Sequence, residues 1–459
     1  MGARERVRYH ARWVVPIATP PIEHGTLIVQ DDRIAWVGPT AQAPAGGRDE
    51  QLGDAILTPG LVNAHTHLDL TAMRGFLEDL PFFEWMRTLT QARAGVLGEA
   101  DLLDSATVGI ADGLRAGITT FGDTADSDAG FDAMRAMGVR GIAYREVFGP
   151  DPADADASLA GLRAKVTAMQ ARRAANALVR VGVSPHAPYS VSDALFAAVA
   201  RYAASERLPV AVHIAESADE HALVTEAAGP FADFLVGRGI QVKVRGTGEI
   251  ELLRAAGLMR AGTLLIHCVR ATALDVRTIA NTGCGVAHCP ASNSKLGHGV
   301  APLADLLAAG ARVGLGSDSM ASNNQMEMLT EARLAVLQQR ALAGCGDLLS
   351  ARAALRLATL GGAEALRLDA EVGSLEAGKQ ADFATFSIDP IYGDVTDPAA
   401  ALIFASHGVR VGRVVIAGVE RMRDGVVAGL DERLPVRVAA ISRRLVEWRV
   451  EWRDAVTGR

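Results

Sequence analysis

From about residue 60 to residue 320 the chain repeats one pattern: a helical stretch rich in Ala, Leu and Arg, then a glycine, then a short apolar run. Examples are RAGITTFGD, AMGVRGIAYRE, NTGCGVAHC and AAGARVGLGSD. Such a glycine suits the left-handed position just past a helix end, and the apolar run after it is typical of a strand buried on both faces. The eight strand candidates lie near 61–67, 118–123, 139–144, 179–184, 209–214, 263–267, 284–287 and 312–317. Eight alternating strand and helix units predict a closed parallel TIM (β/α)8 barrel, an α/β fold that places functional residues at the carboxyl ends of its strands.

The two ends of the chain have a different pattern. TLIVQDDRIAWVG near the start and VGRVVIAGVERMRDGVV at 411–427 are alternating or β-branched runs broken by turn residues, which predicts two hairpins. Neither end has enough strands for a stable sheet, so we expect them to pair into one small composite β-sandwich beside the barrel. The expected divisions are 1–59 and 374–435 for the sandwich, 60–373 for the barrel and 436–459 for a C-terminal helix. The spacing of Leu445, Trp448 and Trp452 suits one packed face of that helix.

Charge and composition exclude several classes of protein. Lys and Arg number 46 against 53 Asp and Glu, a formal net charge of −7, which gives no basis for binding nucleic acid or an anionic membrane. The four cysteines are too few for a disulfide framework, and none forms the CxxC spacing of a structural zinc site. No signal peptide and no apolar window of ~18 residues is present, so we expect a soluble cytoplasmic protein.

Histidines and acidic residues stand at the predicted strand ends. In NAHTH alternate side chains share a face, so His65 and His67 both point into the barrel. His213 ends LPVAVHIAE, His267 ends TLLIHC, and Asp318 ends VGLGSDS. Any one of these histidines has an even chance of being a buried, hydrogen-bonded side chain without a function. Five such groups at the ends of four strands would converge on one point of a barrel, which favours a functional site.

Three neutral imidazoles and one carboxylate suit Zn²⁺, or Fe²⁺ or Mn²⁺ under a different metal supply, and a divalent metal lowers the pKa of bound water to about 7. A second metal would need a bridging group such as a lysine after the fourth strand, where LVRVGVSPHAPYS has none, so we predict one metal. Gly314 and Gly316 share parity with Asp318, from which we expect open space beneath its carboxylate.

Two further side chains have the chemistry of proton transfer. Glu216 follows His213 by three residues and belongs in the turn beyond the strand, where a carboxylic acid can protonate a ring nitrogen. The alternative is a charge that complements a helix dipole. His267 would orient the attacking hydroxide, and Asp318 would both bind the metal and take the proton of the water. Two separate proton carriers are what a hydrolytic deamination needs.

With these residues in view, the chain resembles the amidohydrolase superfamily, and within it the mononuclear adenosine- and cytosine-deaminase-like group. The motifs PGLVNAHTHLDL, SPHAPYSVS, HIAES, HCPASNSKLGHG and GSDSMASNN match that group in order, and GSLEAGKQADFATF resembles the family's return to the β-domain. The resemblance implies one divalent metal held by His65, His67, His213 and Asp318. It also implies that Glu216 and His267 handle protons, and that Arg145, His186 and Glu216 bind substrate.

The resemblance also limits the substrate. Deaminases of S-adenosylhomocysteine and methylthioadenosine carry a ribose-binding glutamate in the helix after the first strand, where this chain has Ala92, Arg93 and Ala94. The stretches NAHTHLDL, PFFEWM and YREVFGP are more similar to aminodeoxyfutalosine deaminases. We therefore expect a small-molecule substrate with an adenine-type 6-amino group, released as ammonia.

Other interpretations remain open at this point. The same site suits an s-triazine chlorohydrolase or aminohydrolase, or a deaminase of guanine- or cytosine-type bases. A non-catalytic assembly protein of this fold would lose metal ligands, whereas this chain keeps all four. Arg145 is either a substrate clamp or a buried partner of Glu146 or Asp123, and His288 and His298 are candidates for lining the pocket. Members of the superfamily often form homodimers, although no feature of the sequence shows it.

Overall fold

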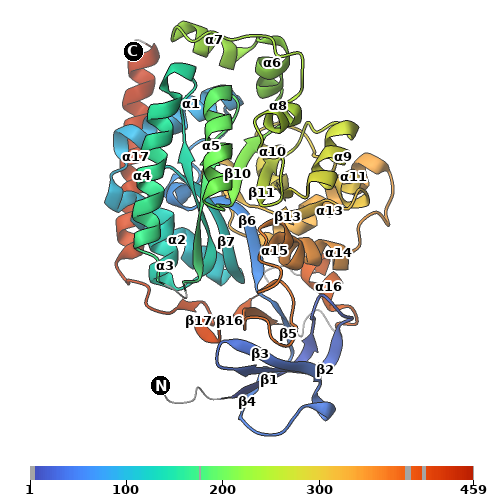
Figure 1. The fold of residues 1–459 in the computed structure, drawn as a ribbon. Helices are drawn as coiled ribbons and strands as arrows, with labels where there is room; N and C mark the ends of the chain where they lie inside the picture. The colour runs from blue at the N-terminus through green and yellow to red at the C-terminus, as the bar shows by residue number, and fades with distance from the viewer. Residues whose placement is uncertain (1–5, 175–176, 388–393, 406–409, 458–459) are drawn as a thin grey trace.

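The computed structural model describes residues 6–174, 177–387, 394–405 and 410–457, the last seven of these as backbone alone. The strands form two sheets, and Figure 1 shows the sheet of the chain ends beneath the larger helix-covered one. The predicted fold class, a (β/α)8 barrel with a smaller β-domain built from both chain ends, is confirmed.

The barrel sheet is entirely parallel and closes on itself. Its strands are β6 (Leu61–His67), β7 (Ile118–Ala125), β8 (Arg140–Val147), β9 (Val179–Pro185), β10 (Val210–Ile214), β11 (Thr263–His267), β12 (Gly285–His288), β13 (Arg312–Leu315) and β14 (Asp318–Ser319). The last two are halves of the eighth strand: β13 pairs with β12, and after a two-residue break β14 pairs with β6. All eight strands expected from the sequence are therefore present, and closure places Asp318 beside Thr66 of β6.

Helices cover the outside of the barrel and its carboxyl end. The outer ring contains α2 (Glu99–Arg115), α3 (Ala129–Met137), α4 (Ala155–Ala171), α5 (Asp193–Ser205), α8 (Glu249–Ala255), α9 (Ala273–Thr282), α11 (Leu303–Ala308), α13 (Met328–Ala343) and α14 (Ala351–Arg356). Helix α15 (Gly362–Ala365) instead packs against inward-facing barrel residues such as Val62 and Ile142. Elements at the carboxyl end are the 3-10 helix η2 (Leu68–Met73), α1 (Phe82–Val96), α6 (Ala218–Glu226), α7 (Pro230–Gly237), α10 (Pro290–Lys295) and α12 (Met320–Asn323).

Local signals in the sequence explain where these helices begin and end. Helix α9 starts at Thr272, whose hydroxyl accepts a hydrogen bond from the backbone of Asp275 while the Asp275 carboxylate accepts one from the backbone of Thr272. It ends at Gly283, which has a left-handed φ of 69°, and Gly138 ends α3 with a φ of 64°. The predicted glycine between each helix and the next strand thus has the expected conformation at both of these junctions.

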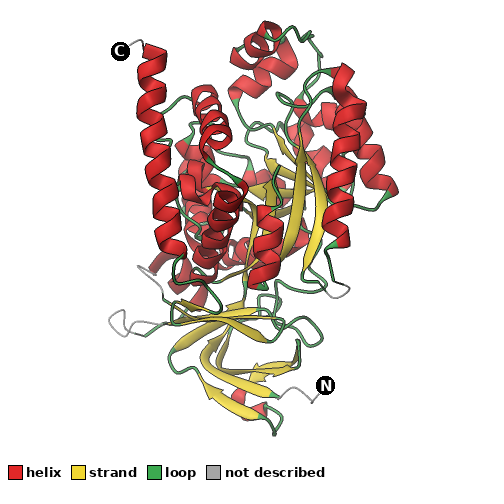
Figure 2. Ribbon diagram, turned by 90° about the vertical axis from the view of Figure 1, so that its left-hand side faces the viewer, coloured by secondary structure: helices red, strands yellow, loops and turns green. Residues whose placement is uncertain are grey.

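The β-domain is one continuous nine-stranded sheet. It contains β1 (Val7–Val14), β2 (Ile22–Gln30), β3 (Arg33–Pro39), β4 (Arg48–Gln51), β5 (Ala55–Pro59), β15 (Phe383–Ser387), β16 (Val411–Ile416), β17 (Val419–Arg423) and β18 (Val426–Val427). Both predicted hairpins form, as β2 with β3 and β16 with β17. The two chain ends meet where β5 pairs antiparallel with β15, and the sheet lies below the barrel in Figure 2.

The C-terminal helix α17 (Leu434–Thr457) runs along one side of the barrel, next to α1 and α2 (Figure 1). Leu445 is buried, and Trp448 packs against the same apolar cluster, while the side chain of Trp452 lies outside the described residues. The short helix α16 (Pro398–Ala400) leads back toward the β-domain. None of the helices in the described part of the chain is both long and apolar enough to cross a membrane.

The space expected beneath Asp318 is filled. A Cβ on Gly314 would lie 2.5 Å from the Cα of Gly362, and one on Gly316 would lie 2.9 Å from the Cβ and carbonyl oxygen of His65. The expectation of an open barrel interior at these glycines is therefore wrong. They allow α15 and β6 to approach the eighth strand closely, which helps to fix the positions of His65 and Asp318.

Candidate active site

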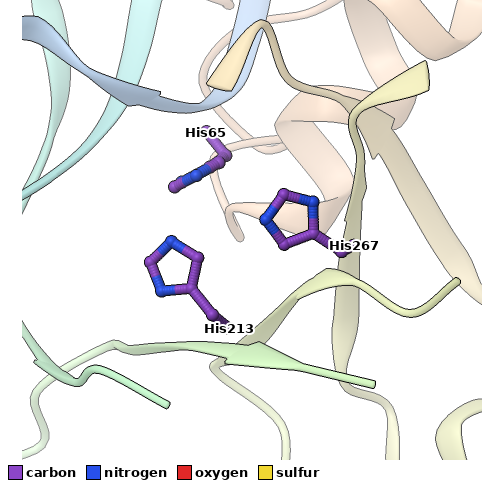
Figure 3. A group of neighbouring side chains, drawn as sticks. All are labelled: His65, His213 and His267. Carbon is purple, nitrogen blue, oxygen red and sulfur yellow. The ribbon is translucent and has the colours of Figure 1, made fainter. Parts of the chain in front are cut away.

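Four histidines and one aspartate from four barrel strands meet at the carboxyl end of the barrel. The Nε2 atom of His65 lies 3.2 Å from Oδ1 of Asp318, and the Nε2 atoms of His67 and His213 lie 3.3 Å apart. Figure 3 shows the rings of His65, His213 and His267 turned toward one another. His65, His213, His267 and Asp318 are all more than nine-tenths buried. The convergence expected from strand-end positions is therefore present as geometry.

Hydrogen bonds on the far side of two of these rings, those of His213 and His267, fix their orientation. Nδ1 of His213 contacts the backbone carbonyl of His186 at 3.2 Å, and Nδ1 of His267 contacts Oδ1 of Asn293 at 2.9 Å. A carbonyl oxygen only accepts, so both Nδ1 atoms carry a proton and both Nε2 atoms present a lone pair to the cluster. This tautomer is the one that binds a cation through Nε2.

The carboxylate of Asp318 is held equally firmly. The hydroxyls of Ser292 and Ser322 donate hydrogen bonds to its Oδ2 at 2.5 and 2.8 Å, which leaves Oδ1 facing His65 and His67. Asp318 has a left-handed φ of 55°, and His267 one of 73°. Non-glycine residues in this region are strained, and such strain collects at functional sites where the surroundings hold it in place.

Burial and charge set the protonation states of the cluster. Burial lowers the pKa of His65 to about 4 and holds that of His213 well below its usual range, with a further lowering from neighbouring imidazoles. Burial by itself would raise the pKa of Asp318, but the hydrogen bond to His65 and the nearby imidazoles hold it well below its usual range. At neutral pH these groups are neutral nitrogen donors beside an ionised oxygen donor.

This donor set fits a divalent metal ion. Nε2 of His67 lies 3.3 Å from Nε2 of His213 and 3.6 Å from Oδ1 of Asp318, so these three donor atoms are close enough to share one cation. Three imidazoles with one carboxylate are a typical ligand set for a catalytic divalent cation that keeps an open coordination position. The cluster therefore has the geometry and the protonation states of a divalent metal site.

Glu216 stands beside this cluster, directly before α6, which begins after Ser217. Its Oε1 lies 3.4 Å from Nε2 of both His267 and His298, and the hydroxyl of Tyr189 contacts its Oε2 at 3.5 Å. The side chain is 4 % exposed and lines the cavity, so it does not act merely as a solvated charge at a helix start. Burial acts to raise its pKa, but the imidazoles of His267 and His298 outweigh burial and lower it, so Glu216 is a carboxylate at neutral pH.

A cavity of about 1240 Å³ opens above the cluster. Its outer wall is largely aromatic, and the ring of Tyr189 stacks on that of Phe231 with 4.3 Å between centroids. His186 lines the cavity and keeps a neutral ring, because burial and the nearby His67 lower its pKa to about 3. Nδ1 of His186 hydrogen-bonds with the hydroxyl of Ser190 at 2.7 Å. A cavity with aromatic walls and a few fixed polar groups suits an organic small-molecule substrate.

The structure does not bring Arg145 to this cavity. Its side chain leaves β8 on the helix-facing side, where its guanidinium donates to Oδ1 of Asp128 at 3.0 Å. The partner is thus neither Glu146 nor Asp123, the two considered from the sequence. Arg93, one of the three residues in the stretch where a ribose-binding glutamate was expected, does line the cavity and forms ion pairs with Asp69 and Asp126.

Sequence reasoning missed Glu146 as a site residue. Its side chain is 8 % exposed and lines the cavity, and Oε1 has no hydrogen-bond partner among the described residues. One of its oxygens lies within 4.8 Å of a ring nitrogen of both His67 and His213. The period of two along β8 was the available signal, because the residue next to an outward-facing Arg145 faces inward.

Asn293, in α10 after the seventh strand, was also not assigned a role, whereas His288 and His298 were candidates for lining the pocket. His298 contacts Glu216, in line with a place beside the pocket, whereas His288 is buried in the barrel and neither of its ring nitrogens has a partner among the described residues.

Comparison with known proteins agrees with this geometry. The family model described as the amidohydrolase family matches residues 56–421. The chain belongs to the amidohydrolase family. A protein from Moorella thermoacetica named 5-methylthioadenosine/S-adenosylhomocysteine deaminase is 33% identical to this amidohydrolase over 425 residues, which cover 91% of this chain and 94% of that protein.

Solved structures of similar proteins have the same fold as this amidohydrolase. An adenosine deaminase from Xanthomonas campestris, solved with bound zinc, has a TM-score of 0.84 at 28% identity. The match covers 96% of this chain and 98% of that chain. The aminofutalosine deaminase of Helicobacter pylori, in complex with methylthio-coformycin, has a TM-score of 0.78 at 21% identity, with 90% of this chain and 100% of that chain covered. The second likeness shows the fold alone.

Proposed function

We propose that this amidohydrolase removes the 6-amino group of an adenine-type nucleoside by hydrolysis and releases ammonia. The observation that carries the proposal is the position of Glu216 and His267, which lie 3.4 Å apart beside the histidine and aspartate cluster and face the cavity. The similarity to an adenosine deaminase at 28% identity and to proteins named methylthioadenosine/S-adenosylhomocysteine deaminase supports the same reaction.

The proposed ligands of the metal are His65, His67, His213 and Asp318, and the proposed metal is Zn²⁺. The bound cation would make water acidic enough to supply the attacking oxygen at neutral pH. The zinc in the adenosine deaminase of Xanthomonas campestris supports this choice over Fe²⁺ or Mn²⁺. Metal analysis of protein purified without added metal tests the identity.

Proton transfer is proposed to use the residues around the base. Glu216 begins as a carboxylate, so it first takes a proton from the attacking water and then delivers it to the ring nitrogen next to the carbon under attack. His267, with Nδ1 bonded to Asn293, keeps its Nε2 turned toward the reacting atoms. Asp318, ionised and fixed by two serine hydroxyls, accepts the second proton, which leaves with the amine.

The substrate proposed first is a nucleoside of the aminodeoxyfutalosine type. Arg93 lies in the stretch 92–94, where the ribose-binding glutamate would be expected, and is already paired with Asp69 and Asp126. Acceptors for sugar hydroxyls in this part of the cavity are therefore Asp69, Asp126 and Glu146. The cavity of about 1240 Å³ exceeds the roughly 300–1,000 Å³ of most small-molecule sites, which suits a nucleoside with a large substituent.

A panel of substrates tests the proposal. Metal-loaded protein is supplied with adenosine, methylthioadenosine, S-adenosylhomocysteine, aminodeoxyfutalosine, guanine and cytosine, and ammonia is measured before and after treatment with a chelator. We expect ammonia from the 6-aminopurine nucleosides, most rapidly from aminodeoxyfutalosine, and none after chelation. Turnover of none of these nucleosides would contradict the proposal, and halide release from a chlorinated s-triazine would favour the chlorohydrolase alternative instead.

A further inference from the structure

A second cavity of about 510 Å³ lies at the opposite end of the barrel from the cluster of histidines. Its walls come from the amino ends of the strands: Arg180 is the second residue of β9, Pro209 precedes β10, and Gly262 precedes β11. The inward-facing residues Ile142 and Tyr144 of β8 form its roof. Because the catalytic residues of a barrel stand at the carboxyl ends of the strands, this cavity is separate from the candidate active site.

The cavity is strongly basic. Five arginines line it together with a single carboxylate, that of Glu206; they are Arg173, Arg180, Arg207, Arg260 and Arg367. Arg180 forms an ion pair with Glu371. Among the described residues, no carboxylate lies within ion-pair distance of the other four arginines. An excess of cations in one half-enclosed space is unfavourable unless an anion balances it.

Several polar groups around the cavity have no partner. Tyr144 is only 2 % exposed and lines the cavity. Nε and Nη2 of Arg260 and Nε of Arg367 are buried donors with no hydrogen-bond partner among the described residues. Buried polar groups are hydrogen-bonded in the great majority of cases, and an exception calls for an unrecorded water or ligand.

We propose that this cavity binds a small molecule bearing a di- or triphosphate group. Guanidinium groups match phosphate oxygens with paired N–H donors, and the Tyr144 hydroxyl adds a further donor from the roof. Five arginines against the carboxylates of Glu206 and Glu371 leave an excess of three positive charges, more than one carboxylate or one monophosphate neutralises, which favours a ligand with three or four negative charges. The volume lies within the roughly 300–1,000 Å³ of small-molecule sites, and the net charge of −7 opposes a long nucleic acid.

Calorimetric titration of the metal-loaded full chain with tripolyphosphate, at constant ionic strength, tests the proposal. We expect saturable binding to one site per chain, weakened at least tenfold by Arg260→Gln. The control Arg277→Gln removes an exposed arginine of α9 that does not line the cavity, and it should leave the affinity unchanged. Orthophosphate and citrate, titrated in parallel, should bind at least tenfold more weakly.

The results of these titrations distinguish binding in this cavity from binding at the proposed metal site. Binding that survives Arg260→Gln but disappears in His67→Ala would place tripolyphosphate at the metal and overturn the proposal. Citrate binding as tightly as tripolyphosphate would overturn the phosphate assignment, and the absence of saturable binding at millimolar concentration would overturn the site. If Arg260→Gln does not fold, Arg173→Gln combined with Arg207→Gln changes only exposed side chains, and it should weaken binding by at least tenfold.

Discussion

The carboxylate of Glu216 is the residue on which the proposed chemistry depends most directly. Replacing it by Gln keeps the size and the contact with Tyr189 but removes the group that carries the proton. We expect Glu216→Gln to lower kcat by about 10²–10⁴-fold, the usual contribution of general acid and base catalysis, with unchanged metal content. Ammonia assays and metal analysis of the same sample check both parts.

A matched control for that variant is Glu226→Gln, an exposed carboxylate in the same helix region. It should keep the full rate. If Glu216→Gln retains more than a tenth of the rate at saturating substrate, Glu216 is not the proton carrier.

His67 allows the proposed ligand set to be tested independently of turnover. Its Nε2 lies 3.3 Å from that of His213 and 3.6 Å from Oδ1 of Asp318, so His67→Ala removes one donor from the proposed metal site. We expect the bound metal to fall from one per chain to well below half after dialysis. His24→Asn, a change at an exposed histidine of β2, should retain its metal. Full metal occupancy in His67→Ala would rule out this ligand.

Residue types and strand parity indicated most of the candidate site but not all of it. His65 and His67 were predictable because a strand fixes which side chains share a face, and His213, His267 and Asp318 because their strands end at them. The prediction that Arg145 binds substrate was based on its charge. Strand parity places Glu146, and not Arg145, on the inward face of β8. Asn293 lies in α10 and His298 in the loop after it, where no periodicity shows which side chains face the site.

At the scale of elements, the strands were predictable and the connections between them were not. The apolar runs are short and flanked by glycine, so their positions follow from burial on both faces. The break in the eighth strand does not follow from the pattern, because it depends on Gly314 and Gly316 fitting against Gly362 and His65 in three dimensions. The same packing fills the space that the shared parity of these glycines with Asp318 suggested was open.

Glu331 ties together the elements that position Asp318. This residue of α13 is 1 % exposed, and its carboxyl group accepts hydrogen bonds from the backbone of Ala291 in α10 and the side chain of Asn323 in α12. Burial raises its pKa from 4.5 to about 8 despite these bonds. Between these two values the folded state holds a proton that the unfolded state has lost, so the stability from this group is greatest below pH 4.5 and declines as the pH rises toward 8.

We therefore expect Glu331→Gln, which cannot ionise, to remove part of the pH dependence. Between pH 5 and pH 8 the Tm of the variant should fall by less than the Tm of the unchanged protein, as measured by thermal unfolding followed by circular dichroism. In the control Glu226→Gln, Tm should fall between pH 5 and pH 8 by as much as in the unchanged protein. Parallel curves for Glu331→Gln and the unchanged protein would show that Glu331 ionises normally in the folded state.

At the scale of the whole molecule, the β-domain joins strands that precede the barrel in the sequence to strands that follow it. A composite domain was predictable, since neither flank has enough strands for a stable sheet by itself. That the strands would form one continuous sheet, with β5 beside β15, depends on contacts far apart in sequence and was not predictable. Gly60 alone separates β5 from β6, so the position of this sheet bears directly on the strand that carries His65 and His67.

A buried ion pair joins the barrel to the β-domain. Arg140 at the start of β8 donates from Nε to Oδ2 of Asp382 at 2.7 Å and from Nη2 to Oδ1 at 3.1 Å, and the two residues are 4 % and 3 % exposed. Removing one partner of a buried pair leaves the other charge without compensation, which costs roughly 3–5 kcal/mol. We expect Arg140→Ala to destabilise the protein by about that amount, measured by urea unfolding.

A second variant shows whether Arg140→Ala loses stability because a charge is left unpaired or because side-chain packing is lost. In the double variant Arg140→Met with Asp382→Asn no charge is left unpaired, and the amide oxygen can still accept from the backbone of Ala417, which contacts Oδ1 of Asp382 at 2.7 Å. Since replacement of both partners removes the uncompensated charge, the double variant should be more stable than Arg140→Ala. Arg437→Ala, which breaks a surface pair with Asp104, should have a much smaller effect, because solvent screens exposed charges. Equal destabilisation by Arg140→Ala and by the double variant would mean that side-chain packing, and not the charge of Asp382, joins the two parts of the molecule.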